Sequence, residues 1–521
     1  MLPALLCLPF VGALACWFIP ADPPRRLLLV LVAFAELVLA ALCWVFPPAP
    51  VWGEIFVQDA IGRIVLTLTC TLFFAASVYA AGYLHDEDKG VRKDFFQGLH
   101  FSNATEANFA ACLLLFLAAA VLVASTHHFG MLWVGIETTT LVSAPLIYFH
   151  RHARSLEATW KYLMICSVGI ALALVGNLFL DISMQSEAVS SPQMTLSHLL
   201  LRAEKTLQAG ASAQHAGWFK AAFVFMLIGY GTKMGITPMH TWLPDAHSEA
   251  PSLVSALLSG ALLNCAFLGI FRATQVALAA NMGEFASGIL LFFGMLSLLT
   301  AALFIVGQGD FKRLLAYSSV EHMGILLLGL GLTAGFLAHS DTSSPLSAVQ
   351  ARTQTAFVLH MVCHSLVKAA LFMLAGNILA KYHTKSCHDT IGLARTLRFT
   401  GAMWLAGILA ITGTPPFGIF MSEFGILQAI LLKTPSAPWV VWGLAGLYLF
   451  LLCVIFIGMI TPAVHMYRGK APFGITPVRR ESLLLTVPPA VLLCLALGIG
   501  LFMPQWLSEA FGSVVHSLAA H

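Results

Sequence analysis

The sequence predicts an all-α membrane protein that crosses the bilayer about fourteen times. Apolar residues make up 59% of its 521 residues, charged residues make up only 10%, and the mean hydropathy is +0.86. A soluble domain usually carries about 25% charged residues, so this composition excludes a soluble fold. Apolar runs of about 20 residues, the length that crosses the hydrocarbon core of a bilayer, recur along the whole chain.

Each apolar run is predicted to form one membrane-spanning helix. The first run begins at Met1 without a basic segment before it or a small-residue cleavage site after it, which is typical of a retained helix rather than a signal peptide. The predicted spans are residues 2–20, 27–46, 60–84, 106–125, 130–149, 160–181, 218–238, 251–274, 283–307, 315–338, 354–380, 400–431, 438–465 and 483–503.

Positive charges are concentrated in alternate loops between these spans. The positive-inside rule places the loops rich in lysine and arginine in the cytoplasm, so both chain termini are predicted to lie on the extracytoplasmic side of the cytoplasmic (inner) membrane. The cations of these loops are Arg25, Arg26, Lys89, Arg92, Lys93, Arg151, Arg154, Lys161, Lys312, Arg313, Lys381, Lys385, Arg395, Arg398, Arg468, Lys470, Arg479 and Arg480. The opposite loops hold only Arg202, Lys205, Lys220, Arg272, Arg352 and Lys433.

The sequence carries no pattern for a redox cofactor or a metal. Its eleven cysteines lie mostly inside apolar runs and include no CxxC pair, so they predict no iron–sulfur, zinc or disulfide site. No glycine-rich phosphate loop follows a strand. We therefore expect no bound cofactor and no nucleic-acid partner.

Two predicted spans, the seventh and the twelfth, are interrupted by glycine and proline beside a charge. The segments are "GYGTKMGITP", which holds Lys233, and "ITGTPPFGIFMSEF", which holds Glu423. Such breaks free backbone groups that only a protein-buried or water-lined interior can satisfy. If spans four to eight and nine to thirteen form two five-helix units, each break is the fourth helix of its unit.

An odd number of helices in each unit inverts the second unit relative to the first. Paired broken helices at corresponding positions are typical of inverted-repeat transporters. Two unrelated proline kinks are the structural alternative. We expect a single membrane domain with repeats at about 108–274 and 283–467 and with flanking helices at 1–84 and 483–503.

Several ionisable residues lie inside the predicted spans, where each costs at least about 2.5–3.5 kcal/mol. The segment "VLHMVCHSLVKAALFM" places His360, His364 and Lys368 at i, i+4 and i+8, on one face of one helix. Histidine titrates near neutral pH, so this face predicts a ladder for protons. A metal shared by the two histidines is the alternative, but no carboxylate or cysteine accompanies them on that face.

Lys233 needs a partner or water at membrane depth. Glu137, in "MLWVGIETTTL", is the only carboxylate within the core of the fifth span. We hypothesise that the two approach each other, because an ion pair would keep Lys233 protonated until the pair separates. The isolated Glu36 is interpreted as a structural polar group between helices.

Four longer segments resemble one family of membrane proteins. They are "TKMGITPMHTWLPDAHSEAPSLVSALLSGALL", "GDFKRLLAYSSVEHMGI", "HMVCHSLVKAALFMLAGN" and "TGTPPFGIFMSEFGIL". They resemble the antiporter-like, proton-pumping membrane subunits of respiratory complex I, a family that includes Mrp-type cation/proton antiporters and the membrane arms of group 4 hydrogenases. The resemblance runs from about residue 108 to residue 467, and "YSSVEHMGI", with Glu321 and His322, is most similar to component F of hydrogenase-4.

The resemblance implies roles for the buried groups. On the fifth and seventh helices, Glu137 and Lys233 match a carboxylate–lysine pair, and on the twelfth Glu423 matches the terminal proton-binding residue. The central relay positions of the eleventh helix are matched by His360, His364 and Lys368.

One position departs from the family's pattern. Asn264, in "SGALLNCAF", stands where lysine or histidine is usual, and an amide carries no proton at ordinary pH. Either waters held by Asn264 bridge the gap, or the lateral proton path is interrupted here. Glu321 and His322 are further relay candidates.

The segment "PMHTWLPDAHSEAP" is predicted to be a cytoplasmic loop after the seventh span. Its titratable groups could form a proton entry, and the alternative is helix capping, because Pro251 suits the first turn of the following helix. The groups concerned are His240, Asp245, His247 and Glu249, with Ser248 as a further cap. Residues 183–216 predict a polar extracytoplasmic loop with a short helix.

The resemblance implies a proton-translocating, antiporter-like subunit of a membrane-bound redox complex, hydrogenase-like or complex I-like, and the buried charges and broken helices agree with it. It would hold no redox site itself. Electron transfer in its partners, other membrane subunits and a peripheral redox arm, would drive protons through the buried groups and water. Two alternatives stay open: a subunit that exchanges Na⁺ or K⁺ for protons, and a non-conducting scaffold of the same complex.

Overall fold

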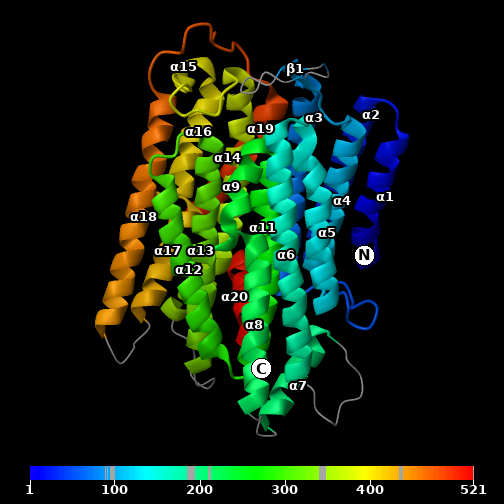
Figure 1. Cartoon of the computed structure of the whole chain (residues 1–521), viewed down its shortest axis with the longest axis vertical. Helices are drawn as coiled ribbons and strands as arrows, with labels where there is room; N and C mark the ends of the chain where they lie inside the picture. The colour runs from blue at the N-terminus through cyan, green and yellow to red at the C-terminus, as the bar shows by residue number, and fades with distance from the viewer. Residues whose placement is uncertain are drawn as a thin grey trace.

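The computed structural model describes residues 1–87, 90, 92–93, 100–184, 194–208, 213–339, 348–432 and 438–519. These residues form a bundle of helices that run side by side, with one short antiparallel pair of strands among the described residues (Figure 1). The elements are α1 (Leu2–Phe18), α2 (Asp22–Val45), α3 (Ala60–Asp86), β1 (Arg92–Lys93), β2 (His100–Phe101), α4 (Glu106–Ser125), α5 (Phe129–Ile147), η1 (Tyr148–His150), α6 (Ala153–Ser183), α7 (Leu196–Gln208), α8 (Ala213–Met234), η2 (Met239–Thr241), α9 (Trp242–Glu249), α10 (Ser252–Leu257), η3 (Leu258–Leu262), α11 (Leu263–Ala279), α12 (Gly283–Ile305), α13 (Phe311–His339), α14 (Ala348–Tyr382), α15 (Leu393–Thr396), α16 (Arg398–Ile411), α17 (Gly418–Leu432), α18 (Pro438–Tyr467), α19 (Leu483–Leu501) and α20 (Gln505–Ala519).

The fourteen predicted spans all correspond to helices. Twelve of the described helical segments are long and apolar enough to cross a membrane, and the other two predicted spans are the shorter α1 and the pair α16–α17. The all-α polytopic prediction is therefore confirmed. The short helix predicted within residues 183–216 is α7, although residues 185–193 and 209–212 lie outside the described ranges. Helix α20 was not predicted, and it packs against α11 and α14.

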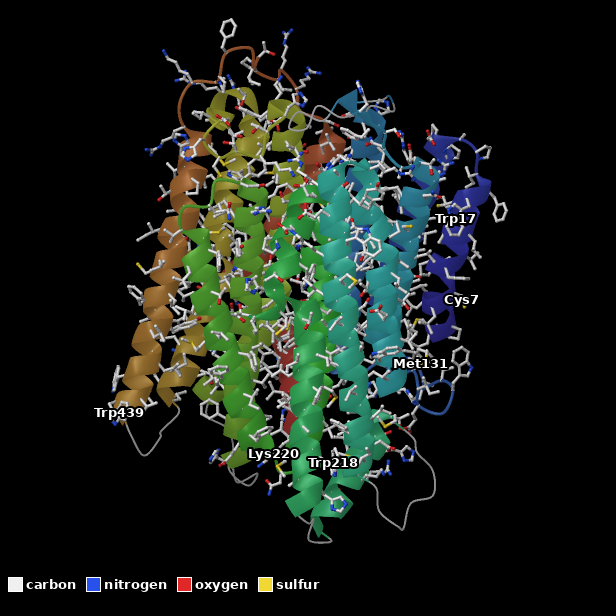
Figure 2. The ribbon with its side chains drawn as sticks, in the orientation of Figure 1. Cys7, Trp17, Met131, Trp218, Lys220 and Trp439 are labelled. Carbon is white, nitrogen blue, oxygen red and sulfur yellow. The ribbon has the colours of Figure 1, made fainter. Side chains whose placement is uncertain are left out.

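Different elements lie at the two ends of the bundle. The hairpin of β1 and β2 and the short α15 lie at one end, whereas α7 and the C-terminus lie toward the other (Figure 1). Exposed tryptophans mark both ends: Trp17 lies toward the first, and Trp218 and Trp439 lie at the second (Figure 2). Tryptophan is enriched at both membrane–water interfaces, so these rings are consistent with a transmembrane bundle.

The centre of the bundle is formed by the helices that hold most of the predicted ionisable groups. In the apolar windows of Ser252–Ala279 and Ala351–Tyr382 every residue is buried, whereas in α18 only 22% of the window is buried. Helices α10, α11 and α14 thus lie inside the protein, and α18 lies at its edge, as does α2 (Figure 1). Charges on the central helices therefore face protein rather than lipid.

The predicted break in the seventh span is confirmed. Helix α8 ends at Met234, Gly235 follows in the left-handed region with φ of +80°, and the chain continues through η2 into α9. At the interruption the carbonyl of Thr232 accepts hydrogen bonds from the amide of Gly235 at 3.2 Å and from the indole of Trp242 at 2.8 Å. The break is thus satisfied from within the protein, as a bilayer requires.

The predicted break in the twelfth span is also confirmed, between α16 and α17. Gly413 lies between the two helices with φ of +64°. A third irregularity was not predicted: the π-helical segment η3 interrupts the eighth span between α10 and α11. Such segments occur often at functional sites.

Candidate functional site

Lys233 is fully buried in the last turn of α8, just before the first break. Its ammonium donates hydrogen bonds to the hydroxyl of Thr140 at 2.7 Å and to the hydroxyl of Tyr162 at 2.5 Å. It also lies 4.5 Å from the centre of the Tyr162 ring. The Tyr162 hydroxyl in turn lies 2.7 Å from that of Ser143. We call Lys233, Thr140, Ser143 and Tyr162 the lysine site.

Glu137 does not form the predicted ion pair with Lys233. None of the ion pairs among the described residues joins the two, and the Glu137 carboxylate instead accepts a hydrogen bond from Ser167 at 3.0 Å. Its second oxygen is buried without a hydrogen-bond partner. The predicted ion pair between Glu137 and Lys233 is therefore wrong for this structure. Hydroxyls of α5 and α6 surround the Lys233 ammonium instead.

His360, His364 and Lys368 lie on one face of α14, as predicted, and all three are fully buried. The rings of His360 and His364 are nearly parallel, with centroids 6.5 Å apart. The Lys368 ammonium donates to the carbonyl of Leu315 and the hydroxyl of Ser318, both on α13. The predicted arrangement of the three residues on one helix face is thus confirmed. The hydrogen bonds of Lys368 join this face to α13.

His322 of α13 joins this ladder through direct contacts. Its Nδ1 lies 3.1 Å from Nε2 of His360, and its ring centroid lies 5.0 Å from that of His364. The other nitrogen of His360 lies 2.9 Å from the hydroxyl of Ser422. Both ring nitrogens of His364 are buried without a hydrogen-bond partner among the described residues. Glu321, next to His322 in the chain, is also buried.

Glu423 of α17 completes the cluster from a third helix. Single ligand atoms of His322, His360 and Glu423 all lie within 4.8 Å of one another. A Cβ on Gly413 would lie 2.1 Å from a Glu423 carboxylate oxygen, so the break brings backbone against this carboxylate. We call His322, His360, His364, Lys368 and Glu423 the histidine site.

The histidine site is also the place where the described residues could best hold a metal. On sequence alone, no carboxylate lies on the face of α14 that holds the two histidines. In the structure the carboxylate is that of Glu423, which comes from α17. Two imidazoles and a carboxylate within reach of one point suit a divalent transition metal. In this structure, however, His322 and His360 bond directly to each other, and Ser422 contacts the second nitrogen of His360.

Asn264 lies in the interior between the two sites and bridges two helices. Its amide nitrogen donates to the carbonyl of Gly260, in the π-helical segment, at 2.7 Å and to the hydroxyl of Ser365, on α14, at 2.8 Å. A second polar bridge joins the same segment to α13, between the hydroxyls of Ser259 and Ser319 at 2.9 Å. The amide oxygen of Asn264 is buried without a partner.

The segment predicted as a cytoplasmic loop is folded instead into η2 and α9. His240 and His247 are buried rather than solvated, and His247 stacks on Phe372 with centroids 4.8 Å apart. Within the part of the chain that the structure describes, neither ring nitrogen of His247 has a hydrogen-bond partner. Proline and charges favour a loop in sequence, but packing against α6 and α13 makes the segment helical.

The acidic residues of α9 form ion pairs rather than helix caps. Asp245 pairs with Lys161 at 3.0 Å and with Arg313, and Glu249 pairs with Lys385 at 3.0 Å. The expected cap is wrong, because α10 begins after Pro251 without any side-chain cap.

Lys312 was predicted to be a cation of a cytoplasmic loop, but the structure buries it. This buried lysine of α13 donates to the carbonyl of Ala250 at 2.6 Å, at the C-terminal end of α9. A cation at a helix C-terminus stabilises it through the helix dipole.

Comparison with known proteins gives consistent results. A family model described as "NADH:quinone oxidoreductase/Mrp antiporter, TM" matches residues 126–449. The chain is 39% identical over 311 residues to "Hydrogenase-4 component F homolog" of Methylacidiphilum infernorum, which is 60% of each chain. It is 37% identical over 215 residues to "Hydrogenase-4 component B" of Escherichia coli, which is 41% of this chain and 31% of that relative. The chain thus spans less than two thirds of these relatives.

Solved structures share the fold at low identity. A chain of the Mrp complex from Dietzia sp. DQ12-45-1b aligns with a TM-score of 0.76 and 19% identity, covering 99% of this chain and 97% of that chain. A chain of respiratory complex I from Thermus thermophilus with bound NADH aligns with a TM-score of 0.78 and 20% identity, covering 100% of this chain and 99% of that chain. Both comparisons support the polytopic all-α architecture.

Proposed function

Since this chain belongs to the NADH:quinone oxidoreductase/Mrp antiporter family, we propose that it is a proton-translocating subunit of a membrane-bound redox complex. The observation that carries the proposal is the pair of buried sites, each beside a broken helix. Charged groups at membrane depth are costly and mark ion paths. Broken helices in corresponding positions are the usual place for such a path.

The lysine site suits a group that gains and loses a proton. The ammonium of Lys233 is held by neutral hydroxyls and an aromatic face, without a carboxylate in contact. Hydroxyls can donate as well as accept, so Thr140 and Tyr162 can bond to the neutral amine as they bond to the ammonium. On this proposal, a charge change in a neighbouring subunit acts through Glu137 and decides when the proton leaves.

The histidine site suits transfer among several carriers. A neutral imidazole has one donor and one acceptor nitrogen, so the His322–His360 contact can pass a proton by exchanging these roles. Lys368 and His364 lie at one end of the site and Glu423 at the other. We propose that the proton moves along them toward Glu423, which serves as the terminal carrier.

The lateral connection between the two sites runs past Asn264. Its unpartnered amide oxygen and the Ser259–Ser319 bridge offer hydrogen bonds to water in this region. Water held there would bridge the gap that the missing lysine or histidine leaves. The repeats at about 108–274 and 283–467 would then each contribute one half of the path.

A proton entry at α9 is part of the same proposal. His247 is a buried imidazole without a hydrogen-bond partner, only a few residues from the charged end of α9. It would receive protons from the predicted cytoplasmic side, with His240 as a further carrier, and the chain termini would lie on the opposite side of the cytoplasmic membrane.

The partners are proposed from the relatives. Those named above include components of hydrogenase-4 and chains of the Mrp complex and of respiratory complex I. We propose neighbouring membrane subunits and a peripheral redox arm, whose electron transfer supplies the energy.

The Na⁺ or K⁺ antiporter remains the second candidate. The family description, which includes Mrp antiporters, favours it. Against it, a cation stripped of water requires a cage of oxygens, whereas the buried charges here alternate between cations and carboxylates.

The test uses the purified complex in vesicles and measures proton pumping and redox turnover together. Glu423→Gln should abolish coupled pumping, because an amide cannot release a proton. The matched control is Glu284→Gln, which neutralises an exposed carboxylate of α12. Full pumping by Glu423→Gln would leave only the scaffold interpretation, pumping that requires Na⁺ would favour the antiporter, and loss of activity after dialysis against EDTA would point to a metal at the histidine site.

A further inference from the structure

The loop between α18 and α19 carries an unusual concentration of exposed positive charge. Residues 468–480, which we call the basic strap, arch over α15 and α16 at one end of the bundle (Figure 1). Nitrogen-tipped side chains extend outward from this loop (Figure 2). The cations of this segment are Arg468, Lys470, Arg479 and Arg480, and all four are exposed.

Backbone hydrogen bonds hold the strap at both of its ends. At one end the carbonyl of Arg468 accepts a hydrogen bond from the amide of Gly392 at 2.9 Å. At the other end the amide of Val478 donates to the carbonyl of Thr396, also at 2.9 Å. The backbone is therefore held against α15, and the four cationic side chains of the strap are exposed.

The exposed cations of this region form no ion pairs among the residues that the structure describes. Arg395 and Arg398, beside the strap, are exposed as well, and none of the ion pairs among the described residues involves these two arginines or the four cations of the strap. The nearby Glu481 is occupied, because its two carboxylate oxygens accept hydrogen bonds from the backbone amides of Phe399 and Thr400 at 2.8 and 3.0 Å. Six cations thus face outward together.

Apolar side chains lie beside these cations, where α16 and α19 begin. Phe399 is 72% exposed and Leu483 is 74% exposed. Phe473, within the strap, has a relative exposure of 108%, so its side chain is fully exposed. Helices α16 and α19 pack against each other, and both start at this end. A phospholipid complements this arrangement, because its anionic phosphate lies next to its apolar acyl chains.

We propose that the basic strap, together with Arg395 and Arg398, binds anionic phospholipid headgroups at the predicted cytoplasmic face of the membrane. The phosphates contact the six cations, the acyl chains lie along the apolar starts of α16 and α19, and Phe473 inserts into the interface. Clusters of four to eight lysines and arginines directly after a membrane helix are typical of such recognition. This proposal is independent of the proton path.

The experiment measures the lipid selectivity of the full chain in vesicles with spin-labelled phosphatidylglycerol and phosphatidylcholine. The unaltered chain should prefer phosphatidylglycerol, and the triple variant Lys470→Gln/Arg479→Gln/Arg480→Gln should reduce the preference about ten-fold at low salt. High salt should weaken the preference of the unaltered chain toward that of the variant.

A matched pair of single variants separates a specific site from general charge. Arg480→Gln should reduce the preference, whereas Arg151→Gln, which removes an exposed arginine from the loop after α5, should not. Equal effects of the two variants, or an unchanged preference in the triple variant, would overturn the proposal. If the triple variant keeps its lipid preference but loses partner subunits during purification, the strap binds an acidic protein instead, and the lipid proposal is wrong.

Discussion

Lys233, beside the break between α8 and α9, and Glu423, beside the break between α16 and α17, are both buried at membrane depth, but their neighbours differ in chemistry. The ammonium of Lys233 is surrounded by hydroxyls, which hold no exchangeable charge near neutral pH. The carboxylate of Glu423 lies among imidazoles, whose ring nitrogens can bind and release a proton. The lysine site therefore has one proton carrier in contact with neutral groups, whereas the histidine site has several carriers in series.

Under the proposed function, the two broken helices therefore have different tasks. A single carrier whose contacts are neutral hydroxyls responds to a charge beyond those contacts, such as that of Glu137. A series of carriers passes a proton onward once it arrives. The predictions below alter one site at a time, in order of decreasing effect on pumping.

The largest of these effects is expected at the lysine site with Tyr162→Phe. The variant keeps the ring next to the ammonium but removes a hydroxyl that bonds to both Lys233 and Ser143. A hydrogen bond to a charged group contributes about 1.5–3 kcal/mol, so proton pumping should fall roughly 10- to 100-fold. Tyr317→Phe, at a half-buried tyrosine of α13, should leave pumping unchanged. Equal pumping by both variants would mean that the hydroxyls of the lysine site are structural.

A smaller effect is expected at the histidine site with Gly413→Ala. The added Cβ would lie 2.1 Å from a carboxylate oxygen of Glu423, and the φ of +64° disfavours alanine by about 1–2 kcal/mol. The carboxylate must move away, so pumping should fall roughly ten-fold while the protein still folds. The control is Gly443→Ala in α18, where a Cβ has open space. Unaltered pumping by Gly413→Ala would mean that the position of the carboxylate is not critical.

The smallest effect on pumping is expected at an ion pair that lies outside both sites. Asp59, before α3, accepts two hydrogen bonds from the buried Arg272 at 2.6 and 2.8 Å. Asp59→Asn leaves this guanidinium without its counter-charge, so the free energy of unfolding should fall by about 3–5 kcal/mol, with pumping per folded molecule unchanged. Thermal unfolding measures the first quantity, and a loss of pumping per folded molecule would place Arg272 in the proton path.

The pH dependence of the same pair has a definite sign. Burial acts to raise the pKa of Asp59, but the Arg272 guanidinium and hydrogen bonds from Arg272 and His127 outweigh burial and hold that pKa well below its ordinary value. The stabilisation is therefore present above the ordinary pKa of aspartate, about 3.9, and is lost only as the pH falls through the lower folded value. The difference in stability between the parent and Asp59→Asn should stay constant from about pH 5 to pH 8.

The helices and their breaks were predictable because each depends on a short stretch of chain. Apolar runs mark the spans, and glycine with proline beside Lys233 and Glu423 marks the breaks. The ladder on α14 was equally predictable, because i, i+4 spacing fixes one face of a helix. All of these features are local in the sequence.

The contacts of the two sites were not predictable because they join different helices. Nothing in "WKYLM" distinguishes Tyr162 from an ordinary interfacial tyrosine, and only the packing of α6 against α8 brings it to Lys233. The carboxylate of Glu423 meets His322 and His360 through three separate helices. Local composition also misled at α9, where proline and charges imitate a loop although the segment is packed inside.

The central claim is that Lys233 carries a proton, and one substitution tests it most directly. Lys233→Met keeps the length of the side chain but removes the charge, and Lys220→Met removes an exposed lysine from the opposite end of the same helix (Figure 2). Proton pumping and redox turnover are measured on the purified complex in vesicles. The account predicts that pumping falls at least about 100-fold in Lys233→Met and is unchanged in Lys220→Met. Equal pumping by the two variants would contradict it, because a buried lysine that can be replaced by methionine without loss is not a carrier.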